Sequence, residues 1–61
     1  MPAIFINMLT GKTQEQKDQL VRKITDAAVD ALDARPEKVS VFISEYPENN
    51  VANNGVMYSQ Q

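Results

Sequence analysis

The chain has 61 residues and a net charge of −2, and it contains neither cysteine nor histidine. Disulfides and thiolate metal sites are therefore excluded, and with histidine the commonest transition-metal ligand is absent, so we expect no metal. Acidic and basic residues are interspersed without a basic stripe, which argues against nucleic acid as a partner. No apolar run approaches the roughly 20 residues that span a bilayer, and no signal peptide is recognisable. We therefore expect a cytoplasmic protein that does not contact a membrane.

The small size sets a further constraint on how the chain becomes stable. We expect a single domain over residues 1–61, and a domain of this size buries only about 60% of its unfolded surface. Small folds usually need disulfides, a metal or self-association, and the composition leaves only self-association. The chain is therefore predicted to form a homo-oligomer.

The first predicted element is a β-strand over residues 3–9, which begins directly after Pro2. Successive side chains of a strand point to opposite faces, and both faces of this segment are largely apolar. Such a pattern is typical of a strand that is covered on both sides.

A long helix is predicted over residues 14–32. Thr13 followed by Gln16 three residues later forms a capping-box pattern, which marks the N-terminus of a helix. Residues 33–36 are expected to end it, because Pro36 disfavours helical geometry at Arg35. The interior carries an apolar stripe at helical spacing, formed by Leu20, Ile24, Ala27, Ala28, Ala31 and Leu32.

The second half of the chain predicts a strand over residues 39–44, a loop over residues 45–50 and a hairpin over residues 51–58. Valine and isoleucine alternate with serine and phenylalanine in the strand, as expected for two distinct faces. The hairpin prediction rests on Asn54-Gly55, a dipeptide that favours two-residue turns between antiparallel strands.

Strand, long helix and strand form a βαβ unit with parallel strands, and the C-terminal hairpin makes the predicted fold class α+β. One helix covers only one face of a two-stranded sheet. The other face also carries apolar residues, so it must contact another copy or stay exposed as an apolar patch. Self-assembly is therefore expected from the fold as well as from the size.

Pro2 is the candidate for chemistry. If Met1 is removed, the new N-terminus is a secondary amine held in a ring, in a chain that has no histidine to act as a base. The pKa of an α-amino group is closer to neutrality than that of lysine, and an apolar pocket lowers it further by disfavouring the charged form. Such an amine can serve as a general base. In the simpler interpretation, Pro2 only starts an extended segment.

The chain resembles the 4-oxalocrotonate tautomerase family, the short members of the tautomerase superfamily, over nearly its whole length. No single motif is specific, but their order and the proline at position two together identify the resemblance. The matching pieces are Pro2, residues 8–13 (MLTGKT), residues 15–17 (EQK), residues 32–34 (LDA), residues 39–43 (VSVFI), Glu45 and Asn54-Gly55.

The resemblance implies a β-α-β fold with a C-terminal hairpin, a homohexamer built as a trimer of dimers, and no metal or organic cofactor. Members of this family use the N-terminal proline to move a proton on an unsaturated 2-oxo or 2-hydroxy acid. Pro2 is therefore expected to be the catalytic residue, and a small acidic molecule is the expected substrate.

Three substrate-binding positions follow from the same resemblance, each with a changed residue. Lys12 stands where the family has a carboxylate-binding arginine, and lysine supplies the charge without the planar fork. Ser40 aligns with a second family arginine, and the loss of a charged donor there can cost about 3 kcal/mol of transition-state stabilisation. Arg35 is an alternative cation. Val51 replaces a phenylalanine of the pocket wall, so the pocket is expected to be wider.

Two other functions fit the sequence. The same scaffold can support a hydratase or dehalogenase, in which a cationic Pro2 acts as an acid. The chain can also be a self-assembling module with little catalysis, because two of the expected charged positions are altered.

Overall fold

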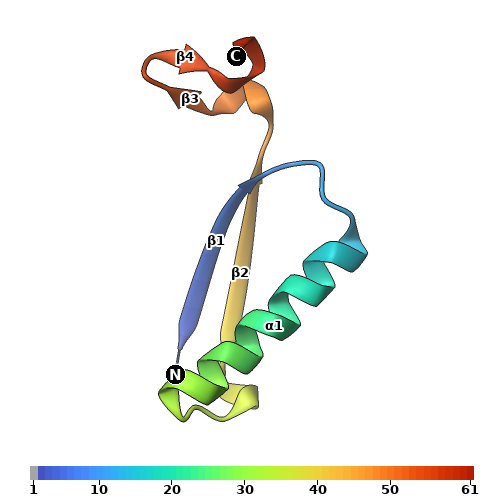
Figure 1. Ribbon diagram of the computed structural model, residues 1–61, viewed down its shortest axis with the longest axis vertical. Helices are drawn as coiled ribbons and strands as arrows, with labels where there is room; N and C mark the ends of the chain where they lie inside the picture. Colours follow the sequence, from blue (N-terminus) through green and yellow to red (C-terminus); the bar gives the residue numbers. More distant parts are fainter. Residues whose placement is uncertain (1) are drawn as a thin grey trace.

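The computed structural model describes residues 2–61, and Met1 lies outside this part of the chain. Strand β1 (Ala3–Leu9) is followed by helix α1 (Gln14–Leu32), which lies across one face of the sheet and returns the chain to strand β2 (Ser40–Tyr46) (Figure 1). The fold is the α+β arrangement that the sequence predicts.

Strands β1 and β2 form a parallel two-stranded sheet that is paired along its whole length. Ala3 lies opposite Ser40 at one end, and Leu9 lies opposite Tyr46 at the other end. Because the strands are parallel, their amino ends share one edge of the sheet and their carboxyl ends share the opposite edge.

The predicted capping box starts α1. The Gln16 N–H donates to Thr13 Oγ1 over 3.1 Å, and the Thr13 N–H donates to Gln16 Oε1 over 3.0 Å. These two bonds satisfy donors that a helix N-terminus leaves unpaired. The helix ends at Leu32 because Asp33 takes the left-handed conformation, with φ of 54°, which a short polar side chain tolerates.

The sequence prediction for β2, residues 39–44, is wrong at both ends. Val39 belongs to the preceding turn, because its N–H donates to the carbonyl of Pro36 over 3.1 Å. At the other end the strand continues through Tyr46, whose carbonyl accepts a hydrogen bond from the Thr10 N–H over 2.9 Å. The pairing with β1 therefore extends the strand into the segment that was expected to be a loop.

The predicted hairpin is present as β3 (Ala52–Asn53) and β4 (Val56–Met57), which pair antiparallel. The turn residues Asn54 and Gly55 have φ of 54° and 79°, as a two-residue hairpin turn requires. The hairpin stands beyond the carboxyl ends of β1 and β2, at the opposite end of the molecule from the N-terminus (Figure 1). Single-turn helices flank it at Glu48–Asn50 and Tyr58–Gln60, and a third, Pro36–Lys38, precedes β2.

The core of the isolated chain is incomplete. Among residues 2–61 the only fully buried side chain is Ala28, which is 7% exposed. The Cα radius of gyration is 14.6 Å, whereas a compact chain of this length is expected to have about 10.5 Å. Apolar side chains on the face under α1 are half-buried, namely Ile4, Ile6, Met8, Val41 and Ile43.

No helix in residues 2–61 is long and apolar enough to cross a membrane.

The sheet face away from α1 is open and apolar. Phe5 and Phe42 are 70% and 49% exposed on this face. Their rings stack on each other with centroids 4.9 Å apart and an interplanar angle of 13°. We call this surface the phenylalanine face. A pair of aromatic rings in solvent is the type of patch that usually marks a contact with another protein surface.

Candidate active site

Two of the predicted site residues meet at the amino edge of the sheet. Pro2 is half-buried just before β1, and its carbonyl accepts a hydrogen bond from the Ser40 N–H over 3.0 Å. This bond fixes the backbone on the carbonyl side of the proline ring. The expected removal of Met1 concerns a residue outside the described part of the chain.

The other two predicted residues lie at the carboxyl edge. Lys12 is in the turn after β1, and Val51 lies between the Glu48–Asn50 turn and β3. Strands rise about 3.3 Å per residue, so the seven residues of β1 separate the two edges by about 20 Å. A small molecule that contacts Pro2 therefore does not reach Lys12 or Val51 of the same chain.

Lys12 lines a hollow of about 240 Å³ between β1 and the start of α1, which we call the lysine hollow. Its other polar side chains are Gln16 and Lys17, and Met8 and Leu20 provide the apolar part. The lysine hollow is thus a small, positively charged site of the kind that a carboxylate can occupy.

A larger hollow of about 710 Å³ lies between the carboxyl edge of the sheet and the hairpin, and we call it the tyrosine hollow. The Tyr46 hydroxyl donates to Asn7 Oδ1 over 2.9 Å. Neither Asn7 nor Tyr46 was predicted as part of a site, and Tyr46 was assigned to a loop. The signal that could have placed Tyr46 in the strand is its aromatic ring directly after an alternating segment, since aromatic residues favour strands. The lining includes Asn7, Tyr46, Asn50, Met8, Leu9 and Val51.

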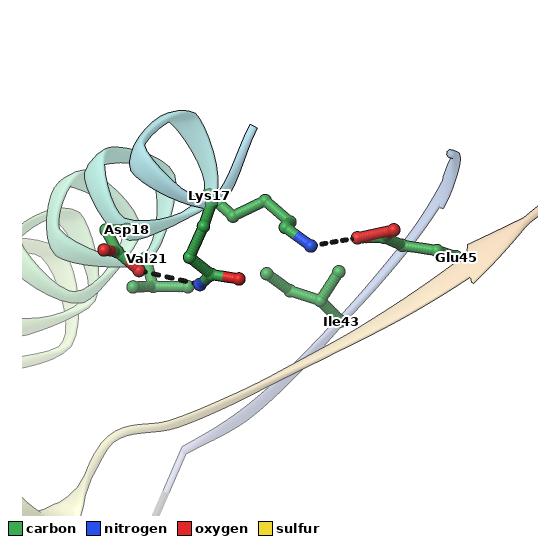
Figure 2. Close-up of a pocket in the computed structure, with 6 residues that line it drawn as sticks. Lys17, Asp18, Val21, Ile43 and Glu45 are labelled. Carbon is green, nitrogen blue, oxygen red and sulfur yellow. Dashed lines mark hydrogen bonds and ion pairs between the residues drawn. The ribbon is translucent and has the colours of Figure 1, made fainter. Parts of the chain in front are cut away.

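A third hollow, of about 460 Å³, lies between α1 and β2 and contains an ion pair. Figure 2 shows Lys17 extending from the helix to Glu45 on the strand, with Ile43 beside them. The Lys17 Nζ to Glu45 Oε1 distance is 2.5 Å, and the side chains are only 21% and 26% exposed. Glu45 was expected in the loop over residues 45–50, but in the structure it lies in β2, where it neutralises Lys17 and joins the helix to the sheet.

Arg35, the alternative cation, makes a different contact. Its Nε lies 3.5 Å from Glu37 Oε2, and both side chains are largely exposed. Such a surface pair contributes little to stability, and it directs the guanidinium to a neighbouring acid. Within residues 2–61 no group of three or more acidic, histidine or cysteine side chains is placed to hold a metal ion.

The chain thus has a β-α-β unit with a terminal hairpin, a proline ahead of its first strand and one uncovered sheet face. The sequence matches the family model described as "Tautomerase enzyme" over residues 2–61. The chain belongs to the tautomerase family and is an isomerase.

Named relatives agree with this family. The chain is 42% identical over 52 residues to a 2-hydroxymuconate tautomerase of Bacillus subtilis, with 85% of this chain and 84% of the relative covered. It is 40% identical over 50 residues to a 2-hydroxymuconate tautomerase of Pseudomonas sp. (strain CF600), with 82% and 79% covered.

Solved structures have the same fold. A homologue of 4-oxalocrotonate tautomerase gives a TM-score of 0.94 at 38% identity, with 98% of each chain covered. A heterohexamer 4-oxalocrotonate tautomerase from Chloroflexus aurantiacus gives a TM-score of 0.93 at 32% identity, with 98% of this chain and 97% of that chain covered.

Proposed function

We propose that this enzyme moves a proton on a small unsaturated 2-oxo or 2-hydroxy acid, without a cofactor and with the nitrogen of Pro2 as the general base. The observation that most directly supports this proposal is the position of Pro2 just before β1, where its carbonyl accepts a hydrogen bond from the Ser40 N–H. Once Met1 is removed, the free amine is attached to a backbone that is already fixed. Two relatives named 2-hydroxymuconate tautomerase support an enol acid as the substrate class.

The proposed reaction needs one proton carrier and no change of oxidation state. The lone pair of the Pro2 nitrogen accepts a proton from one position of the conjugated acid, and an electron pair shifts along the conjugated system. The resulting ammonium group then returns the proton to a different carbon, which restores the free amine. A positioned base of this type typically contributes 10²–10⁴-fold to the rate, roughly.

The proposed pocket combines residues from two copies of the chain. Pro2 and Ser40 lie at one edge of the sheet, and Lys12 and Val51 lie about 20 Å away at the other edge. We therefore propose that the substrate lies between Pro2 of one protomer and Lys12 of a neighbour. The heterohexamer structure of a relative supports a hexamer as the assembly. A cytoplasmic location is part of the same proposal.

The pH dependence of the reaction tests the role of Pro2. Only the neutral amine can accept a proton, so kcat/KM should be lost as the pH falls below the pKa of Pro2 and regained as it rises above it. The hydratase or dehalogenase alternative needs the protonated amine and predicts loss on the alkaline side. The measurement is kcat/KM for 2-hydroxymuconate against pH, beside a nitrogen-detected NMR titration of Pro2. An activity that disappears as Pro2 loses its proton would contradict the base mechanism.

The role of Lys12 is tested by Lys12→Ala. A hydrogen bond between charged groups contributes about 1.5–3 kcal/mol, so kcat/KM should fall roughly 10- to 100-fold, mainly through a higher KM. Lys23→Ala is the matched control, because Lys23 is an exposed lysine of α1 that lines none of the hollows described above. Equal kinetics for the two variants would remove Lys12 from the site.

A further inference from the structure

The hairpin turn contains the one asparagine of the chain that is followed by glycine. In chain order, the residues after the five asparagines are methionine, asparagine, valine, asparagine and glycine. The side-chain carbonyl of an asparagine can be attacked by the main-chain nitrogen of the next residue, which closes a succinimide ring. Glycine has no Cβ, so its nitrogen is the least hindered. Asn54 is therefore the asparagine of this chain that can react with its own backbone most readily.

The conformation of the turn leaves the attacking nitrogen free. Asn54 and Gly55 have φ of 54° and 79°, and the two central residues of such a turn do not take part in the strand ladder. The ladder pairs Asn53 with Val56 and Ala52 with Met57. Within residues 2–61 the Gly55 N–H donates no hydrogen bond to the main chain. The nitrogen is therefore not held by the ladder when it reacts.

The space around the turn is open. Residues 52–58 are all exposed in the isolated chain. A Cβ placed on Gly55 would meet no atom within 4 Å. Water, which is required to open a succinimide, therefore reaches both carbonyl carbons of the ring.

The hairpin is short enough to open by itself. Ring closure requires the Asn54 backbone to rotate out of its turn conformation. β3 and β4 pair over two residues each, and an isolated two-stranded hairpin is only marginally stable in water. Such a segment opens locally at a much lower free-energy cost than the whole fold. The reaction therefore does not require β1, β2 or α1 to unfold.

We propose that Asn54 is a self-modification site, at which the chain converts asparagine into a mixture of isoaspartate and aspartate. The Gly55 nitrogen forms a bond with Cγ of Asn54, the bond from Cγ to Nδ2 breaks, and the Gly55 amide proton leaves with Nδ2 as ammonia. Water then adds to the succinimide. Cleavage of the bond from the ring nitrogen to Cγ gives aspartate, and cleavage of its bond to the main-chain carbonyl carbon gives isoaspartate. The reaction involves no change of oxidation state and needs neither a substrate nor the Pro2 amine.

The two products have different effects on the hairpin. Aspartate keeps the backbone, and Asp-Gly also favours a two-residue turn, so this product changes only the net charge, from −2 to −3. Isoaspartate routes the main chain through the side chain, which adds one methylene group to the turn. The pairing of Asn53 with Val56 is then no longer joined by a normal two-residue turn. We expect β3 and β4 to separate in the isoaspartate form.

The test is to age the full-length protein at mildly alkaline pH and to locate the conversion by peptide mass spectrometry. Each conversion adds about 1 Da, because an amide becomes a carboxylic acid. We expect Asn54 to convert at least roughly tenfold faster than the other asparagines, since only its following residue lacks a Cβ. Asn53 is the internal control, because it lies in the same exposed hairpin. Equal rates at Asn53 and Asn54, or no conversion at Asn54, would overturn the proposal.

Isoaspartate itself is counted by an isoaspartyl methyltransferase, which transfers a labelled methyl group from S-adenosylmethionine to the new carboxylate. Asn54→Gly removes the reacting amide and suits the positive φ of this position, so it should accumulate no label. Asn53→Thr is the matched control and should accumulate label at the wild-type rate. Label in Asn54→Gly equal to that in the wild type would place the reaction elsewhere and refute the assignment.

The effect on the hairpin is measured by amide hydrogen exchange of β3 and β4. The isoaspartate fraction of aged protein should exchange faster there than fresh protein, with α1 unchanged. Asn54→Asp provides the charge without the added methylene group and should exchange as fresh wild type does. Faster exchange in Asn54→Asp equal to that of the isoaspartate form would show that charge, and not the longer backbone, opens the turn, which would contradict the expected effect.

Discussion

Adding one residue ahead of Pro2 is expected to lower kcat/KM by roughly 10²–10⁴-fold, the range that a positioned general base contributes. The added residue converts the secondary amine into an amide, which has no basicity at any working pH. The rest of the chain is unchanged, and the hydrogen bond from the Ser40 N–H to the Pro2 carbonyl does not depend on the free amine. Intact mass confirms the extension, and kcat/KM is measured on phenylenolpyruvate and 2-hydroxymuconate.

The control for this experiment is the same residue added after Gln61, which should leave both rates unchanged. Pro2→Ala is an intermediate case, because it keeps a primary amine but loses the ring that restricts the direction of the lone pair. Its loss should be smaller than that of the blocked protein. A blocked protein with wild-type rates would end the proposed mechanism.

Local signals in the sequence predicted the first half of the fold correctly. β1 and α1 have the predicted bounds, because the capping box of Thr13 and Gln16 sets the helix start through contacts within four residues. The Asn54-Gly55 turn was predicted for the same reason, since the two residues adopt the required positive φ themselves.

The misassigned end of β2 and the tyrosine hollow depend on partners that are distant in the sequence. Glu45 and Tyr46 stay in the strand because they pair with Met8 and Leu9 of β1. Their side chains contact Lys17, 28 residues before Glu45, and Asn7, 39 residues before Tyr46. Neither contact leaves a periodic pattern in one sequence. Glu45 and Tyr46 were therefore assigned to a loop, and the tyrosine hollow, which Tyr46 helps to line, was missed.

Pro2 was proposed from the chemistry of its amine, and Lys12, Ser40 and Val51 were proposed by resemblance. Physical reasoning from the single chain could not have combined them. The structure brings Pro2 next to Ser40 but leaves Lys12 and Val51 at the other edge of the sheet. A site that depends on a neighbouring copy has no signature in the order of residues along one chain. Only the open sheet face and the small core indicate that a neighbour is needed.

Replacing Phe42 by aspartate is expected to dissociate the assembly and to abolish activity with it. Phe42 is 49% exposed in the isolated chain and stacks on Phe5, and burial of such a ring against a second copy is worth about 1.5–3 kcal/mol per chain. A carboxylate in an apolar interface adds a further penalty because it has no cation. Light scattering should show a lower mass, and thermal unfolding should shift to lower temperature and depend on protein concentration.

Comparing Phe42→Asp with the blocked Pro2 protein separates the effect of assembly from the effect of the catalytic amine. Gln19→Asp places the same charge on an exposed position of α1 and should keep the wild-type mass and rates, so charge alone is not the cause. Phe5→Asp should reproduce Phe42→Asp, because the two rings form one surface. The blocked Pro2 protein should keep its mass and lose activity, whereas Phe42→Asp should lose both, because Pro2 and Lys12 of one chain are about 20 Å apart. A monomeric Phe42→Asp protein with full activity would show that one chain contains a complete site.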